Sequence, residues 1–193
     1  MYDYITIERS YACGGHEIAS ILAKKLNYRL YDDNVLVETC KRLNMPYNML
    51  SNLDEQAPIG IHTKFHGEKL LPMEEQIYRT ETEIIRDAAA EPGCIFIGRC
   101  ASEMIKDKTC LRVFITADLD FRKNRALNVE KIPPKELDHT MKKFDTRRKK
   151  FFTAHAHAKW GTVEFFDLVL DSGHLGIETC AEILVTACRV GNA

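Results

Sequence analysis

An apolar, β-branched stretch at residues 4–7 runs into small residues and two adjacent glycines, Gly14 and Gly15, and a helical pattern begins directly behind them. A strand, a glycine-containing loop and a helix in this order gather backbone N–H groups and a helix N-terminus around one point, where they bind phosphate. Glycine supplies the positive φ and the close backbone approach that such a loop needs. This segment therefore predicts a phosphate-binding loop, although a tight strand–helix turn without a ligand would show the same glycines.

The loop lacks the residues that usually complete it. An ordinary phosphate loop has a lysine and then a serine or threonine at the start of its helix. When residues 8–19 are placed on that pattern, Arg9 stands at the first glycine, Gly15 at the lysine and Glu17 at the Mg²⁺-binding hydroxyl. The missing positive charge and the missing metal ligand must then come from other residues.

The rest of the chain alternates between short apolar strands and amphipathic helices. Strands are predicted at residues 4–7, 29–31, 94–97, 111–115 and 168–170, and helices at 16–26, 33–43, 73–90, 101–106, 119–127, 134–152 and 177–190. This alternation predicts an α/β fold, a parallel sheet covered by helices on both faces, with ligands beyond the carboxyl ends of the strands. Between residues 46 and 72 the pattern weakens, which predicts an irregular insertion. The length of 193 residues is that of one domain.

Composition narrows the classes of partner and compartment. The net charge is −1, so bulk electrostatics favour neither a nucleic acid nor a membrane surface. No apolar stretch approaches the roughly 20 residues that span a bilayer, and no signal peptide is expected. The seven cysteines form no CxxC pair, which argues against a disulfide framework or a zinc site. We expect a cytoplasmic protein. The oligomeric state stays open.

Two polar residues follow predicted strands at the carboxyl edge of the sheet. The carboxylate of Asp32 is suited to accepting a substrate hydroxyl or holding a metal through water, but it also fits the N-cap of the next helix. Arg99 comes one residue after a buried strand and a glycine, and its guanidinium is suited to bidentate phosphate recognition. The alternative for Arg99 is an ordinary surface arginine.

A group of basic residues follows in the second half of the chain. Arg122 and Arg125 are spaced to lie on one side of a helix, and a second basic stretch contains Arg147 and Arg148. Most charge runs are solvated helix faces, yet phosphoryl transfer needs cations that neutralise the transferred group. A basic helix followed by the polar segment 155–159 therefore predicts a closing lid.

These landmarks, in this order, resemble the cytidylate kinase-like family, a branch of the nucleoside monophosphate kinases. The resemblance is carried by Ile5-Thr6-Ile7, Gly14-Gly15-His16-Glu17-Ile18-Ala19, Tyr31-Asp32, Gly98-Arg99-Cys100-Ala101, Asp145-Thr146-Arg147-Arg148, Trp160, Phe166-Asp167-Leu168-Val169-Leu170-Asp171-Ser172 and Leu175-Gly176. It implies a P-loop kinase fold with a five-stranded parallel sheet, ATP and Mg²⁺ over the first loop, an acceptor-binding insertion at residues 46–72, and a lid at residues 134–160. The chain departs from the branch at Ala12 and Cys13, which replace its usual Gly-Ser, and at His16, which replaces its usual arginine.

Together the residues and the resemblance predict a set of site residues. We expect ATP at Ala12, Cys13, Gly14, Gly15, His16, Glu17, Arg122 and Arg125, the acceptor at Asp32 and Arg99, Mg²⁺ at Glu17, and catalytic cations at Arg9, Arg147 and Arg148. The expected activity is phosphoryl transfer from ATP to a small acceptor, CMP or another pyrimidine nucleoside monophosphate first. Two alternatives stay open: a kinase of another small hydroxyl compound, which Asp32 favours, and a nucleotide-binding protein without turnover, which the missing lysine favours.

Overall fold

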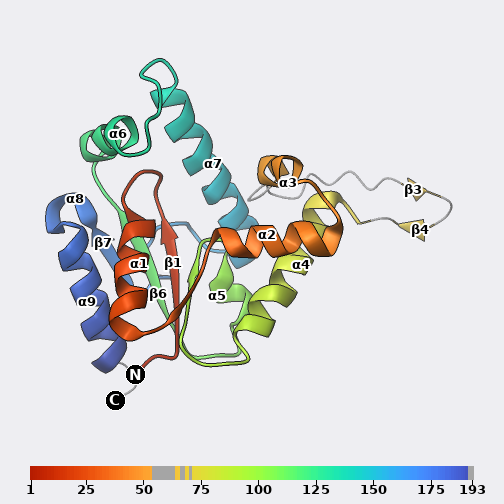
Figure 1. Cartoon of the computed structure of the whole chain (residues 1–193), viewed down its shortest axis with the longest axis horizontal. Coiled ribbons are helices and arrows are strands. Elements are labelled where there is room, and N and C mark those ends of the chain that lie inside the picture. The colour runs from red at the N-terminus through yellow and green to blue at the C-terminus, as the bar shows by residue number, and fades with distance from the viewer. Residues whose placement is uncertain (54–63, 66–67, 70, 191–193) are drawn as a thin grey trace.

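A five-stranded sheet forms the centre of the molecule in a computed structural model that describes residues 1–53, 64–65, 68–69 and 71–190 (Figure 1). Its strands are β1 (Tyr4–Arg9), β2 (Arg29–Tyr31), β5 (Cys94–Ile97), β6 (Cys110–Thr116) and β7 (Leu168–Asp171). They lie in the order β2-β5-β1-β6-β7, and every neighbouring pair is parallel. The predicted five-stranded parallel α/β sheet is confirmed.

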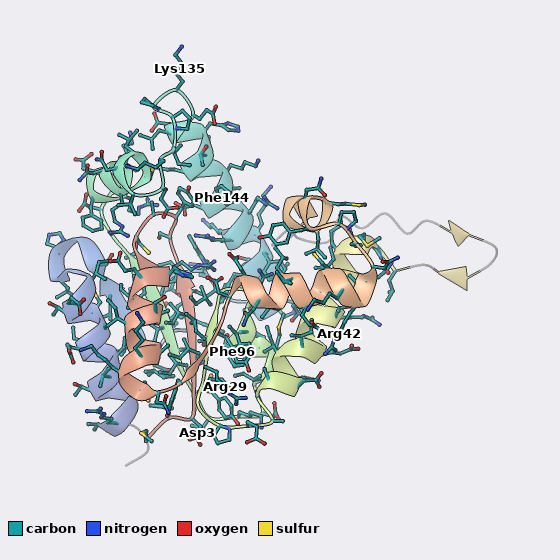
Figure 2. The ribbon with its side chains drawn as sticks, viewed as in Figure 1. Asp3, Arg29, Arg42, Phe96, Lys135 and Phe144 are labelled. Atoms are coloured by element: carbon teal, nitrogen blue, oxygen red, sulfur yellow. The ribbon has the colours of Figure 1, made fainter. Side chains whose placement is uncertain are left out.

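The two faces of the sheet carry two separate apolar cores, because successive side chains of a strand point to opposite faces. Ile5 and Ile95 face one core, shared with α1 (Gly15–Leu26) and α9 (Ile177–Val190). Tyr4 and Phe96 face the other. That second core is completed by α2 (Asp33–Leu43), α4 (Met73–Ala88) and α5 (Ala101–Met104). Figure 2 shows Phe96 between the sheet and these helices.

Three helices lie near the carboxyl ends of the strands. They are α6 (Leu119–Asn128), α7 (Leu137–Ala156) and α8 (Ser172–Leu175). Helix α7 begins at Leu137, later than the prolines that were expected to open it, because residues 133–136 form a turn in which Glu136 N–H bonds to the Pro133 carbonyl. Within the described part of the chain no helix is long and apolar enough to cross a membrane.

The expectation of an irregular insertion at residues 46–72 is partly wrong. This segment contains α3 (Tyr47–Leu53) and a small antiparallel hairpin of β3 (Lys64–Phe65) and β4 (Glu68–Lys69). The helix is held by Leu50, which is fully buried against Leu36 and Ile77. The predicted acceptor-binding role falls largely on residues 54–63, 66–67 and 70, which lie outside the described residues.

Candidate functional site

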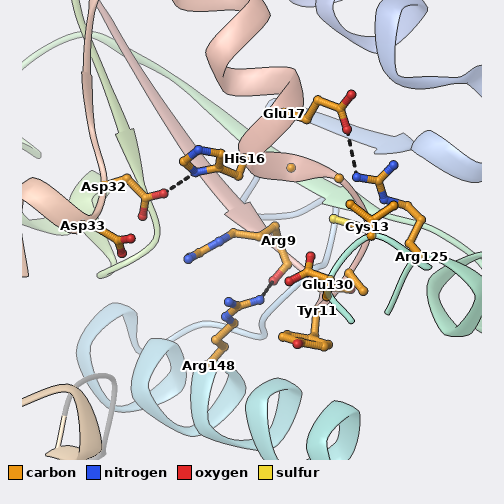
Figure 3. A pocket seen from close by; sticks show the side chains of 15 residues that line it. Arg9, Tyr11, Cys13, His16, Glu17, Asp32, Asp33, Arg125, Glu130 and Arg148 are labelled. Carbon is orange, nitrogen blue, oxygen red and sulfur yellow. Dashed lines mark hydrogen bonds and ion pairs between the residues drawn. The ribbon is translucent and has the colours of Figure 1, made fainter. Parts of the chain in front are cut away.

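A cavity of about 410 Å³ opens where β1 and β2 end and α1 begins (Figure 3). Its lining consists of residues 9–17 together with Asp32, Asp33, Arg125, Val129, Glu130 and Arg148. The cavity thus lies at the carboxyl edge of the parallel sheet, as the fold predicts. It brings together the predicted loop, Asp32 and two of the predicted arginines outside the loop.

Gly14 gives the loop its shape. It has a φ of +80° and precedes α1, and its carbonyl accepts the N–H of Ile18. A Cβ atom at Gly14 would lie 2.3 Å from Cδ1 of Ile177 and 3.3 Å from Cζ of Arg125. The N–H groups in the first turn of a helix have no partner within that helix, and here that turn lines the cavity. Glycine is therefore required at position 14, and the cavity has the donors that an anion needs.

Tyr11 fastens the loop to α6 and α7. Its N–H donates to Oδ1 of Asp145 at 2.7 Å, and its carbonyl accepts from Nη1 of Arg122 at 3.3 Å. The ring stacks on Phe144 with 4.9 Å between centroids and 7° between planes, and the Arg148 guanidinium lies 5.9 Å from its centre. Figure 2 shows Phe144 on α7. Sequence reasoning passed over Tyr11, although a large aromatic residue in a loop of small ones was a usable signal.

The predicted role of Arg122 in binding ATP does not match its position. Arg122 Nη1 pairs with Oδ2 of Asp145 at 2.7 Å, and the residue is not among those described as lining the cavity. Because the same carboxylate accepts the Tyr11 N–H, Arg122 and Asp145 form a bridge between α6, α7 and the loop. In this structure Arg122 thus helps to hold the loop, and its contact with ATP stays a prediction.

Three cations surround the loop: Arg9, Arg125 and Arg148 all line the cavity. Arg148 donates to the Arg9 carbonyl at 3.4 Å, so the lid helix and the end of β1 meet there. Arg125 pairs with Oε2 of Glu17 at 2.8 Å beside Gly14. The cavity therefore contains cations despite the absent lysine, alongside the carboxylates of Glu17, Asp32, Asp33 and Glu130. Arg147 is not among its described lining residues.

The placement of Glu17 at the metal-binding hydroxyl needs correction. In the phosphate-loop pattern the hydroxyl residue directly follows the lysine, so once Gly15 stands at the lysine, His16 stands at the hydroxyl. In the structure the two side chains have different partners: Glu17 pairs with Arg125, and His16 contacts Asp32. Glu17 still lines the cavity, with about half of its side chain exposed.

Asp32 faces the cavity. Its Oδ2 lies 2.5 Å from Nδ1 of His16, and the side chain makes no capping bond to α2. Asn34 makes the local turn contact instead, with Oδ1 accepting the Asp32 N–H at 2.8 Å. Asp32 thus occupies the N-cap position of α2 without capping it through its side chain, and the carboxylate faces whatever enters the cavity.

Arg99 does not reach the cavity. Its guanidinium is buried with an exposed fraction of 6%, and Nη1 pairs with Oε1 of Glu81 on α4 at 2.5 Å. Consecutive positive φ values at Gly98, Arg99 and Cys100 turn the chain away after β5, and the Cys100 N–H then bonds to Glu8 Oε1. The expected phosphate fork is, in this structure, one half of a buried ion pair.

The base of the loop is held by buried contacts. Ser172 Oγ donates to the Cys13 carbonyl at 2.6 Å, and Cys13 Sγ donates to the Ile115 carbonyl at 3.4 Å. Burial raises the pKa of the Cys13 thiol to about 11, although nearby arginine charges oppose the shift. Cys13 therefore stays a thiol at neutral pH and is a structural residue, not a nucleophile. Ser172 was not singled out as a support of the loop.

Comparisons with solved structures show the same fold. An uncharacterized protein from Eubacterium ventriosum is 23% identical, with a TM-score of 0.74 over 97% of this chain and 98% of that chain. Shikimate kinase from Bacteroides thetaiotaomicron is 13% identical, with a TM-score of 0.58 over 97% and 98%. Shikimate kinase from Acinetobacter baumannii in complex with shikimate is 10% identical, with a TM-score of 0.59 over 100% and 96%.

No curated protein has a significant sequence match to the chain. The solved structures show the fold, which is that of the P-loop kinases. The family is shown by the sequence itself, because the model of the cytidylate kinase-like family matches residues 4–174. The loop, the parallel sheet and this match together place the protein in one group: the chain belongs to the cytidylate kinase-like family.

Proposed function

We propose that the protein transfers the γ-phosphoryl group of ATP to a small acceptor. The observation that carries the proposal is the shared cavity, which brings the start of α1 and three arginines together with Asp32, Asp33, Glu17 and Glu130. Phosphoryl transfer needs positioning and charge neutralisation more than covalent chemistry. A single cavity lined by both cationic and acidic groups offers a place for both reactants.

The donor phosphates would lie over residues 12–17. The N-terminal N–H groups of α1 bind the β-phosphate, and Arg9, Arg125 and Arg148 neutralise charge that spreads over the transferred group. Arg147 is retained as a predicted lid cation that would reach the phosphates only on closure. This arrangement replaces one lysine by arginines from β1, α6 and α7.

The residues present fit a magnesium ion that travels with ATP. Mg²⁺ keeps several waters and uses phosphate oxygens with one or two carboxylates. Among the described residues no group of three or more His, Cys, Asp and Glu could hold a metal alone, so the phosphates would supply most of its ligands. Glu17, Asp32, Asp33 and Glu130 are the carboxylates in the described cavity lining that could complete its coordination. Glu17→Gln should weaken Mg·ATP binding more than metal-free ATP binding, and equal losses would remove Glu17 from the metal site.

A pyrimidine nucleoside monophosphate, CMP first, is the acceptor that the family favours. One structural observation favours a different acceptor. A carboxylate such as Asp32 repels a phosphate but accepts hydrogen bonds from hydroxyl groups, and Arg99 is not placed to offset that repulsion. The second candidate is therefore a small hydroxyl compound.

An ADP-release assay over nucleoside monophosphates, sugars and hydroxylated acids, paired with ATP calorimetry, tests the proposal. Turnover with either class supports phosphoryl transfer, and ATP binding without turnover on any acceptor would favour a non-catalytic protein. Asp32→Asn then separates the acceptors. It should lower KM for a phosphate-bearing acceptor, because a repulsive charge is removed, and raise KM for a hydroxyl acceptor, because a charged hydrogen bond is lost.

A further inference from the structure

The two departures of the loop from the phosphate-loop pattern are reciprocal. The pattern has a glycine where this chain has Arg9, and a lysine where this chain has Gly15. The loop therefore keeps one glycine and one cation, but in exchanged positions. Two unrelated losses would not be expected to conserve both residue types.

The structure shows why the positions are linked. A Cβ atom at Gly15 would lie 3.0 Å from Cβ and 3.3 Å from Cγ of Arg9. The first of these distances is too short for a comfortable carbon–carbon contact, which lies near 3.5–4.0 Å. The stem of Arg9 thus occupies the space beside the position where a loop lysine would begin.

The backbone gives no other reason for glycine at position 15. Gly15 is the first residue of α1 and is not among the described residues with positive φ, whereas Gly14 has a φ of +80°. Any L-residue could adopt the backbone at position 15. Glycine is therefore retained there because of its neighbour Arg9 and not because of its own conformation.

Arg9 also lies where a phosphate-binding cation should lie. It is the last residue of β1, its backbone is paired with Ile115, and its carbonyl accepts from Arg148. Its side chain lines the cavity and, in Figure 3, extends beside the start of α1 toward the side where Asp32 and Asp33 lie. A guanidinium in this position can contact two phosphate oxygens through a planar, bidentate fork, whereas an ammonium acts as a compact point charge.

We propose that Arg9 replaces the missing lysine by contacting the β- and γ-phosphates, and that Gly15 provides the space for its stem. The proposal rests on the proposed function, since it assumes that ATP binds over this loop. The cation of the loop is then Arg9 at the end of β1, and the small residue that makes room for it is Gly15 at the start of α1. In this proposal the two residues act as one unit.

A double-mutant cycle tests this unit. Arg9→Gly, Gly15→Lys and the double variant are compared with the wild type by calorimetry with AMP, ADP and ATP. Arg9→Gly should lower the affinity for ATP and ADP by about 10- to 150-fold, as expected for hydrogen bonds to a charged group, and leave that for AMP almost unchanged. The double variant returns the cation to the conventional position and should bind ATP at least about tenfold more tightly than Arg9→Gly.

Two further variants separate charge from space. Arg9→Met keeps most of the stem and removes the charge, so it should lose ATP affinity as Arg9→Gly does. Gly15→Ala should lower the melting temperature in the wild-type background and leave it unchanged, or raise it, in the Arg9→Gly background. The second comparison needs no nucleotide and holds even where Gly15→Lys does not fold.

The outcomes distinguish this inference from the proposed function. Suppose that the wild-type protein binds ATP. If Arg9→Met then binds ATP equally well, or if the folded double variant binds it no better than Arg9→Gly, Arg9 does not replace the lysine, and the proposed phosphoryl transfer is unaffected. Additive melting temperatures for Gly15→Ala and Arg9→Gly would likewise overturn the steric link. If wild-type protein binds no ATP, the proposed function fails and the role of Arg9 fails with it.

Discussion

Arg9 and Arg99 are equally far along the chain from a paired position of two neighbouring strands, yet they serve different parts of the molecule. Ile7 of β1 pairs with Ile97 of β5, and each arginine lies two residues further along its own strand direction. At Arg9 the backbone continues as a strand beside Ile115, and the side chain lines the cavity. At Arg99 the backbone has already turned through positive φ values, and the side chain pairs with Glu81. The path of the backbone after the strand decides whether such an arginine faces a ligand.

The largest expected effect tests the loop side of this comparison. Gly14→Ala should abolish measurable ATP binding, because its Cβ atom would overlap Ile177 and approach Arg125. Gly176→Ala is the matched control, since Gly176 has a φ of +81° and nothing within 4 Å of an added Cβ atom. Gly14→Ala carries a backbone strain of about 1–2 kcal/mol from the left-handed conformation, and Gly176→Ala, with φ +81° and ψ 156°, carries about 1–3 kcal/mol, so backbone strain alone does not separate the two. Calorimetry should show lost ATP affinity in the first variant alone, and equal affinities would remove the loop from the binding site.

The next effect tests the Arg99 side. Arg99→Ala and Glu81→Ala should each lower the free energy of unfolding by about 3–5 kcal/mol, because each leaves a buried charge without its main partner. Replacing both by apolar residues, as in Arg99→Met with Glu81→Leu, should recover most of this loss. Denaturant unfolding measures the cycle. A stable Arg99→Ala protein with a raised acceptor KM would restore the original prediction of an acceptor-binding arginine.

A smaller difference is expected between two adjacent arginines of α7. Arg148 lines the cavity and contacts the end of β1, so Arg148→Ala should lower kcat by about a hundredfold with modest change in ATP affinity. Arg147→Ala shares the helix and the charge change but removes a residue outside the described lining, and its kcat should fall less. Steady-state kinetics on both variants decides. Equal losses would mean that the lid closes further than this structure shows.

The smallest effect concerns the far end of α7, where His155 stacks on Tyr78 of α4 at 3.7 Å. Burial lowers the pKa of His155 below its ordinary value. The folded protein then binds fewer protons than the unfolded chain between this lowered pKa and about 6.5, so its stability falls as the pH falls through that window. Unfolding curves from pH 7.5 to pH 5 should show a weaker pH dependence for His155→Phe. An unchanged slope would assign the acid sensitivity to other groups.

The repeating pattern of the sequence was enough to predict the sheet and most helices, because alternation and helical periodicity are local properties. Strand β5 and helix α2, for example, have the predicted bounds. Leu50 was missed because a short helix over one buried residue has too few turns to show a periodicity. The predicted start of α7 was too early because residues 133–136 form a turn, closed by the hydrogen bond from Glu136 N–H to the Pro133 carbonyl, that the sequence pattern did not reveal.

The site was less predictable because its geometry depends on pairs of distant residues. The sequence indicated the loop, Asp32 and several candidate arginines, but it did not indicate which of these arginines face the cavity. Successive left-handed conformations at Arg99 and Cys100, which L-residues rarely adopt, have no signature that a single sequence could reveal. The Tyr11–Asp145 and Ser172–Cys13 contacts likewise join segments more than a hundred positions apart.

The contacts of Tyr11 with Phe144 and Asp145 couple the position of the phosphate-binding loop to that of α7. Helix α7 has 20 residues and is therefore about 30 Å long. It contacts the loop through Phe144 and Asp145, and near its C-terminal end His155 stacks on Tyr78 of α4. A movement of α7 on lid closure would therefore also move the loop, and it would change the stacking of His155 on Tyr78, on the helix that also carries Glu81.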